Sequence, residues 1–198
     1  YHYITMNNYI YISIPKTGSN SIHEILGNTN YNHIKAITVK KLLGDEEYNT
    51  KNSFCFIRNP IDLVKSWYYY HKFNPRVPEQ EGRLYYPNTI EDWIFKMNCK
   101  THWEEIPHLK NNPHWDINDS PLNQYNWIID ENYNIIVKEI YKFDNINEII
   151  EKKFGIKPNK KNSSNKDNYT LDKKVEDKIT ELFKNDIHFY NTINILIK

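Results

Sequence analysis

Residues 9–22, YIYISIPKTGSNSI, contain the pattern that decides the fold: a buried strand, a polar loop and the start of a helix. The first six are aromatic or β-branched apart from one serine, and the run has the length of a strand buried on both faces. Pro15 ends the run, and the loop Lys16–Ser21 leads into a helix over about residues 22–26 that stops near Gly27. A loop between a parallel strand and a helix lies at the carboxyl edge of the sheet, where α/β proteins bind ligands.

A second strand–helix unit repeats this arrangement. Ser53–Ile57, SFCFI, predicts a strand, and Arg58 follows it directly. Asn59 is a favourable N-cap and Pro60 a favourable first helical residue, so a helix is expected from there to about Phe73. Each unit therefore places a basic residue close to the end of a strand.

The remaining chain continues the alternation of strands and helices. Further strands are predicted at 34–39, with a short helix ending at Gly44, and at 134–141, and helices at 90–97, 124–129, 146–154 and 171–189. The alternation predicts a single α/β domain over residues 1–198, with a mostly parallel sheet that helices cover on both faces. Irregular segments are expected at 76–88 and 99–123, on either side of the helix at 90–97, and a polar, basic loop is expected at 157–167.

Composition excludes several classes of protein. The 26 Lys and Arg residues nearly balance the 25 Asp and Glu residues, so no overall field attracts a nucleic acid, and no such partner is expected. The two cysteines do not make a disulfide framework, and no Cys/His cluster has zinc spacing. No apolar stretch is long enough for a bilayer, which favours a soluble, cytoplasmic protein. Because the chain starts at Tyr1 rather than Met, a protein whose N-terminal leader or anchor was removed is the alternative.

Both strand–helix loops carry groups that bind anions. In the first, the helix N–H groups, the charge of Lys16 and the hydroxyls of Thr17, Ser19 and Ser21 favour an anion, although an ordinary polar loop has a similar composition. The GxxxxGK[ST] spacing of a Walker loop is absent. In the second, Arg58 can grip a phosphate through two nitrogens, or it can pair with a carboxylate. Two anion sites at strand ends of one sheet suit a nucleotide with phosphates at both its 5′ and 3′ positions.

The two motifs together carry a resemblance to a known family. IPKTGSNSI resembles the 5′-phosphosulfate loop of sulfotransferases that use 3′-phosphoadenosine 5′-phosphosulfate (PAPS), and IRNPIDLVKSWYYY resembles their 3′-phosphate motif, R-[DN]-P-x-x-x-x-x-S-x-Y. The chain is most similar to the Golgi-type carbohydrate O-sulfotransferases, including those that sulfate heparan at the 2-O and 6-O positions. The resemblance implies a P-loop-like three-layer α/β/α fold, PAPS as the donor, an oligosaccharide or polysaccharide hydroxyl as the acceptor, and no metal.

The resemblance also implies roles for individual residues. Lys16 would be catalytic, at the bridging oxygen of the donor. The 5′-phosphate would be lined by Pro15, Lys16, Thr17, Gly18, Ser19, Asn20 and Ser21. The 3′-phosphate would be held by Arg58 and Ser66. The alternative role of Ser66 is that of a small packing residue. The loop at 157–170 would cover the nucleotide through Lys160, Lys161, Asn162 and Ser163, unless it is simply a solvated basic loop.

The general base is expected to be His33, which lies between the two motifs where the resembling enzymes carry a histidine; the alternative is a surface or capping histidine. Its rivals are His102, His108, His114, Glu91, Glu104 and Glu105. The segment 74–123 would bind the acceptor, with contacts from His71, Arg76, Arg83, His102 and His114. The aromatic run 67–70 suits a sugar but also suits a core.

Two other functions stay open from the sequence. One is a nucleotide kinase, which would need ATP and Mg²⁺ and which the missing Walker pattern disfavours. The other is a catalytically inactive protein of the same fold that only binds a nucleotide or a glycan.

Overall fold

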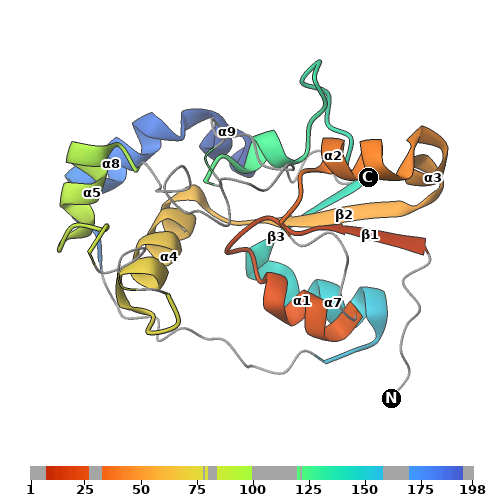
Figure 1. Cartoon of the computed structure of the whole chain (residues 1–198), viewed down its shortest axis with the longest axis horizontal. Helices are drawn as coiled ribbons and strands as arrows, with labels where there is room; N and C mark the ends of the chain where they lie inside the picture. Colours follow the sequence, from red (N-terminus) through yellow and green to blue (C-terminus); the bar gives the residue numbers. More distant parts are fainter. Residues whose placement is uncertain are drawn as a thin grey trace.

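The computed structural model describes residues 8–26, 33–77, 79, 84–99, 120, 122–157 and 170–193. Figure 1 shows α1 and α7 on one side of a small sheet, α2 and α3 on the other, and α4, α5 and α8 beyond the ends of the strands. No helix in this part of the chain is long and apolar enough to cross a membrane. In chain order the elements are β1 (Tyr9–Ile12), α1 (Ser19–Leu26), α2 (Ala36–Leu43), α3 (Asp45–Thr50), β2 (Asn52–Ile57), α4 (Pro60–Phe73), α5 (Ile90–Met97), η3 (Gln124–Trp127), β3 (Glu139–Lys142), η4 (Phe143–Asn145), α7 (Ile146–Phe154), α8 (Lys173–Leu182) and α9 (Lys184–Thr192).

Among the described residues, the sheet has three parallel strands in the order β1-β2-β3. Ile12 lies opposite Cys55 and Ile57 lies opposite Lys142, so the three strands end at one edge. The predicted α/β class and the strands expected near residues 9–14 and 53–57 are confirmed. The loops after β1 and β2 therefore lie side by side.

Alternating side chains of the strands bury both faces of the sheet. Ile10 and Ile12 belong to one apolar cluster, together with residues of α2, α3 and α9. Tyr11, Phe54 and Phe56 belong to another, together with residues of α1 and α7. A two-sided burial of this kind explains why the strand sequences are almost continuously apolar.

A separate apolar cluster, which contains several buried aromatic rings, joins α4, α5 and α8. The indole N–H of Trp67 donates to the hydroxyl of Tyr86 at 2.6 Å, and the hydroxyl of Tyr68 donates to the carbonyl of Pro87 at 2.7 Å. Two of the four aromatic residues at 67–70 are therefore core residues. The helices predicted at 60–73 and 90–97 are confirmed, and the Asn59 side chain caps α4 by accepting from the N–H of Ile61 at 2.9 Å.

The strand predicted at 34–39 is wrong, because these residues begin α2. Ala36 and Val39 are buried and Leu43 is partly buried, a helical spacing that turns one face of α2 to the sheet. The predicted end at Gly44 is confirmed: its N–H donates to the carbonyl of Lys40 at 2.9 Å. Helical packing has overridden the β-branched composition of the segment.

The single helix predicted at 171–189 is two helices, α8 and α9, separated at Phe183. Phe183 packs in the cluster of α4 and α5, whereas Phe189 packs against the sheet. The break lets the chain pass from one cluster to the other, which a straight helix could not do.

Two other segments are shorter than predicted. The strand expected at 134–141 is found only at Glu139–Lys142. Asp130 accepts the main-chain N–H groups of Asn132 and Asn134 in a turn, and the residue after this turn, Ile135, forms an isolated antiparallel bridge with Ile129. The helix expected at 124–129 is the single turn η3. The helix expected at 146–154 is confirmed.

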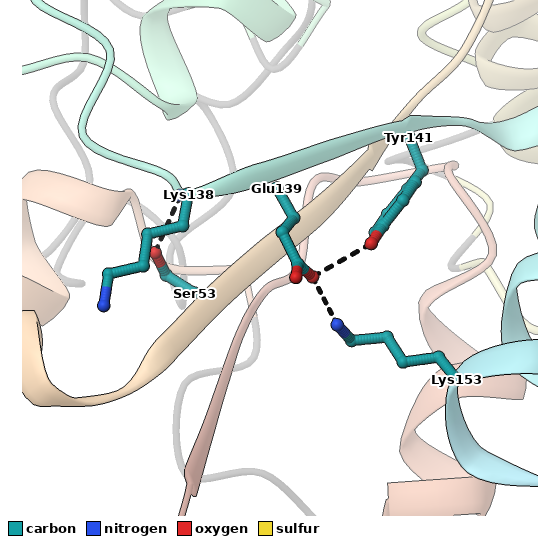
Figure 2. A network of polar contacts seen from close by, with 5 residues as sticks. All are labelled: Ser53, Lys138, Glu139, Tyr141 and Lys153. Atoms are coloured by element: carbon teal, nitrogen blue, oxygen red, sulfur yellow. Dashed lines mark hydrogen bonds and ion pairs between the residues drawn. The ribbon is translucent and has the colours of Figure 1, made fainter. Parts of the chain in front are cut away.

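A polar network holds the amino end of β3 (Figure 2). The Glu139 carboxylate accepts a hydrogen bond from the hydroxyl of Tyr141 at 2.9 Å and pairs with the ammonium of Lys153 from α7. The N–H of Lys138 donates to the hydroxyl of Ser53 at 3.0 Å. These contacts tie β2, β3 and α7 together at the edge opposite the two strand–helix loops.

Candidate functional site

The β1–α1 loop is held from beneath by the carbonyl of Ile14. The hydroxyls of Thr17 and Ser19 both donate to this oxygen, at 2.8 and 3.1 Å, and both side chains are buried. Their hydrogens are thus committed within the loop rather than turned to a ligand. Ser21 and Ile22 donate their N–H groups to Gly18, so the N–H groups of Ser19 and Asn20 precede the first intrahelical bond, where an anion is favoured.

Gly18 brings this loop into close contact with the end of β3. It has a φ of 87°, and a Cβ at this position would lie 2.6 Å from Ile146 Cδ1 and 2.8 Å from Phe143 Cε2. Only glycine fits both the backbone conformation and the space. The close packing at Gly18 therefore fixes the position of the loop relative to η4 and α7.

Lys16 lies near the start of this loop and is partly buried. Its ammonium lies 3.6 Å from the centroid of the Tyr70 ring of α4. Burial, and secondly the charge of Arg58, lower the pKa of Lys16 to about 8. No carboxylate of the described residues lies within ion-pair distance of this ammonium, so its positive charge is available to an anion.

Arg58 joins the second loop to the first. Its Nη1 donates to the carbonyl of Lys16 at 3.3 Å, and the guanidinium lies 5.1 Å from the centroid of the Phe143 ring. Burial lowers the pKa of Arg58, and the charges of Asp62 and Asp144 oppose this effect. Within the described ranges no carboxylate forms an ion pair with Arg58. The two predicted anion residues therefore lie together.

Gln124 was not identified from the sequence, yet it contacts Arg58 directly. Its Oε1 accepts the main-chain N–H of Arg58 at 2.7 Å, and its Nε2 donates to the Arg58 carbonyl at 2.7 Å. In turn, Asp186 of α9 accepts the N–H of Tyr125 at 3.0 Å. A lone glutamine after an irregular segment carries no sequence signal for such a contact.

His33 and His23 converge on Ser13 at the end of β1. The Nδ1 atom of His33 lies 3.0 Å from the Ser13 carbonyl, and Nε2 of His23 lies 3.3 Å from the Ser13 hydroxyl. Because a carbonyl can only accept, Nδ1 of His33 carries the hydrogen, and Nε2 is the unprotonated nitrogen of the neutral ring. Burial is the main cause that lowers the pKa of His33, with smaller contributions from the charges of His23 and Lys16. His33 is therefore neutral near pH 7 and lies close to the Lys16 loop.

A buried hydroxyl lies directly behind the loop. Tyr11 is 1% exposed, and its hydroxyl has no hydrogen-bond partner among the described residues. It lies beside the hydroxyls of Ser13, Thr17 and Ser19 without reaching hydrogen-bond geometry with any of them. A buried hydroxyl without a partner at hydrogen-bond geometry is rare in proteins.

The other predicted site residues are placed as follows. Pro15 is buried in the first loop and Ser66 is partly buried in α4. His71 stacks on Trp67 and Tyr86 and its Nδ1 lies 2.9 Å from the Trp67 carbonyl, so it belongs to the aromatic cluster. Arg76 is exposed just after α4, and the rival base Glu91 is exposed in α5. Outside the described residues lie Arg83, His102, Glu104, Glu105, His108, His114, Lys160, Lys161, Asn162 and Ser163.

No family model matches the chain, and comparisons with curated proteins and with solved structures gave no match.

Proposed function

We propose that this protein is a PAPS-dependent sulfotransferase that transfers the sulfuryl group to a hydroxyl, most simply that of a carbohydrate. The observation that carries the proposal is the pairing of two cations at adjacent ends of parallel strands. Lys16 follows β1, Arg58 follows β2, and Arg58 Nη1 lies 3.3 Å from the Lys16 carbonyl. A donor that carries a phosphosulfate on the 5′ carbon and a phosphate on the 3′ carbon of one ribose needs two such positions close together.

The first loop is suited to the 5′ end of the donor. Lys16 has a positive charge without a described carboxylate partner, the start of α1 presents main-chain N–H groups, and the orphaned hydroxyl of Tyr11 lies behind them. A P-loop-like three-layer fold is part of the proposal. It is supported by the strand–loop–helix geometry and by the helices packed on both faces of the sheet.

The transfer requires a base and a cation in fixed positions. The acceptor oxygen attacks the sulfur while the bond from sulfur to the bridging phosphate oxygen breaks. Nε2 of His33 accepts the hydroxyl proton, since the Ser13 carbonyl holds the hydrogen on Nδ1. Lys16 stabilises the negative charge that develops on the leaving oxygen. Adenosine 3′,5′-bisphosphate, the sulfated acceptor and a proton on His33 are the products of this step.

The acceptor is expected to approach along the exposed part of α4. The ring of Tyr70 lies over Lys16 and remains 39% exposed, and Phe73, one turn further along, is 58% exposed. Exposed rings next to the reacting position are suited to the apolar face of a sugar. His71, in contrast, is partly buried and stacks on the rings of Trp67 and Tyr86, and it is a weaker candidate for an acceptor contact.

Calorimetric titration with adenosine 3′,5′-bisphosphate, AMP and ATP, without metal, tests the proposal. Tight binding of the bisphosphate with weak binding of AMP is the expected result. Arg58→Ala should remove this preference, whereas Arg76→Ala, an exposed arginine beyond α4, should keep it. In a parallel titration with Mg²⁺ present, binding of ATP in place of the bisphosphate would favour a kinase; absence of binding by all three nucleotides would contradict a donor site. Turnover with PAPS and a glycan library then separates an enzyme from an inactive binding protein.

A further inference from the structure

The main chain of Arg58 is held by a side chain that is 66 residues away in the sequence. Gln124 makes two hydrogen bonds of 2.7 Å, one to the N–H and one to the carbonyl of Arg58. It is 1% exposed, so water does not compete for either bond. In a sheet, a neighbouring strand would bond the N–H and the carbonyl of a residue in the same way. The side-chain amide of Gln124 therefore replaces a neighbouring strand at Arg58, one residue beyond the end of β2.

The main chain around Gln124 is itself held in place by a buried carboxylate. Asp186, which is 5% exposed, accepts the N–H of Tyr125 at 3.0 Å and also faces the N–H of Gln124. A carboxylate at the amino end of a short helix satisfies N–H groups that have no intrahelical acceptor. The position of Gln124 is thus fixed by α9, independently of β2.

The guanidinium of Arg58 points from this anchored main chain toward the first loop. Its Nη1 contacts the carbonyl of Lys16, and its plane lies near the ring of Phe143. A long side chain with several rotatable bonds reaches one position reproducibly only if its backbone direction is fixed.

We propose that Gln124 is the positioning residue of the second anion site: by holding both main-chain groups of Arg58, it directs the guanidinium toward the 3′-phosphate. This role rests on the proposed function of Arg58. It gives Gln124 an effect on ligand selectivity beyond its contribution to folding.

Gln124→Glu is the sharpest test, because it nearly preserves the shape of the side chain. A carboxylate can still accept the N–H of Arg58, but it cannot donate to the carbonyl and instead repels it. The added negative charge is controlled by Asn126→Asp, the same kind of change two residues along η3, in a side chain that is not among the described partners of Arg58. Gln124→Met removes both bonds and serves as the second variant.

The quantity to measure is the ratio of the affinities for adenosine 3′,5′-bisphosphate and for AMP, below the unfolding temperature of every variant. We expect Gln124→Glu and Gln124→Met to lower this ratio about tenfold while AMP affinity stays within about twofold of the control. A lower melting temperature with an unchanged ratio would show that Gln124 is only structural, and so would an equal loss for both ligands. If the unmodified protein has no preference for the bisphosphate, the proposed function fails and the role of Gln124 fails with it. If that preference exists and survives in both variants, only the role of Gln124 is overturned.

Discussion

Replacing Gly18 by alanine tests how closely the first loop packs against the rest of the fold. The added methyl would lie 2.6 Å from Ile146 Cδ1 and 2.8 Å from Phe143 Cε2, about 1 Å closer than an ordinary contact between carbon atoms. Overpacking of this size costs about 1–3 kcal/mol. The φ of 87° adds about 1–3 kcal/mol for a residue with a Cβ. We therefore expect Gly18→Ala to lower the free energy of unfolding by about 4 kcal/mol, a large part of the usual total of about 5–15 kcal/mol.

Urea unfolding measures this loss and separates its two causes. With a slope of about 2 kcal/mol per molar urea, the midpoint should fall by about 2 M. Gly44→Ala and Gly155→Ala are matched controls, since they have φ values of 83° and 68° and no atom lies within 4 Å of the added methyl. Their free energy of unfolding should fall only by the cost of the backbone conformation, about 1–3 kcal/mol. If Gly18→Ala is no more destabilising than these two, the close packing of the loop against Phe143 is refuted.

Three further predictions concern ionisable groups near the site. Affinity for PAPS should fall about tenfold per pH unit above pH 8, because Lys16, with a pKa of about 8, loses its charge there. Lys16→Arg should keep the affinity constant to about pH 10. An affinity that does not change with pH in the unmodified protein would contradict the role of Lys16. His33→Gln should lower kcat by about 10²–10⁴ and abolish the fall in rate that protonation of His33 causes at acidic pH, with bisphosphate affinity retained. Because burial lowers the pKa of His33, this fall should begin at a lower pH than for an exposed histidine; a normal kcat would assign the base elsewhere. Burial raises the pKa of Asp186 to about 6, so the fold loses stability as the pH rises from about 4, where the unfolded carboxyl ionises, to above 6. Asp186→Asn should therefore raise the unfolding free energy at pH 7 by up to about 3 kcal/mol and give little gain at or below pH 4; equal effects at both pH values in urea unfolding would disprove this.

Local signals in the sequence were sufficient where short-range chemistry determines the structure. Asn59 caps α4 and Pro60 begins it as expected, and Gly155 ends α7. The strand at 34–39 was predicted wrongly because Ile37 and Val39 suit a strand by composition, while burial in the fold follows the helical spacing of Ala36 and Val39 in α2. That preference is set by packing against the sheet, which a local pattern does not contain.

The candidate site divides in the same way. Lys16 and Arg58 were predictable, because each follows a recognisable strand directly or nearly so. Gln124 and Asp186 were not, since their contacts join segments that are more than sixty residues apart. The inward direction of the hydroxyls of Thr17 and Ser19 depends on the Ile14 carbonyl, an atom that every residue type supplies equally.

The two cysteines give the protein a pair of internal reporters. Cys55 lies buried in the sheet cluster and Cys99 in the cluster of α4, α5 and α8, and burial raises the pKa of both thiols, that of Cys99 to about 12. Neither thiol can react with an alkylating reagent until its surroundings open. Pulsed alkylation followed by mass spectrometry therefore measures the opening of each cluster separately, in the natural sequence and without an introduced label. If the helical cluster opens before the sheet, Cys99 will be modified first, and the order of labelling will identify the less stable half of the fold.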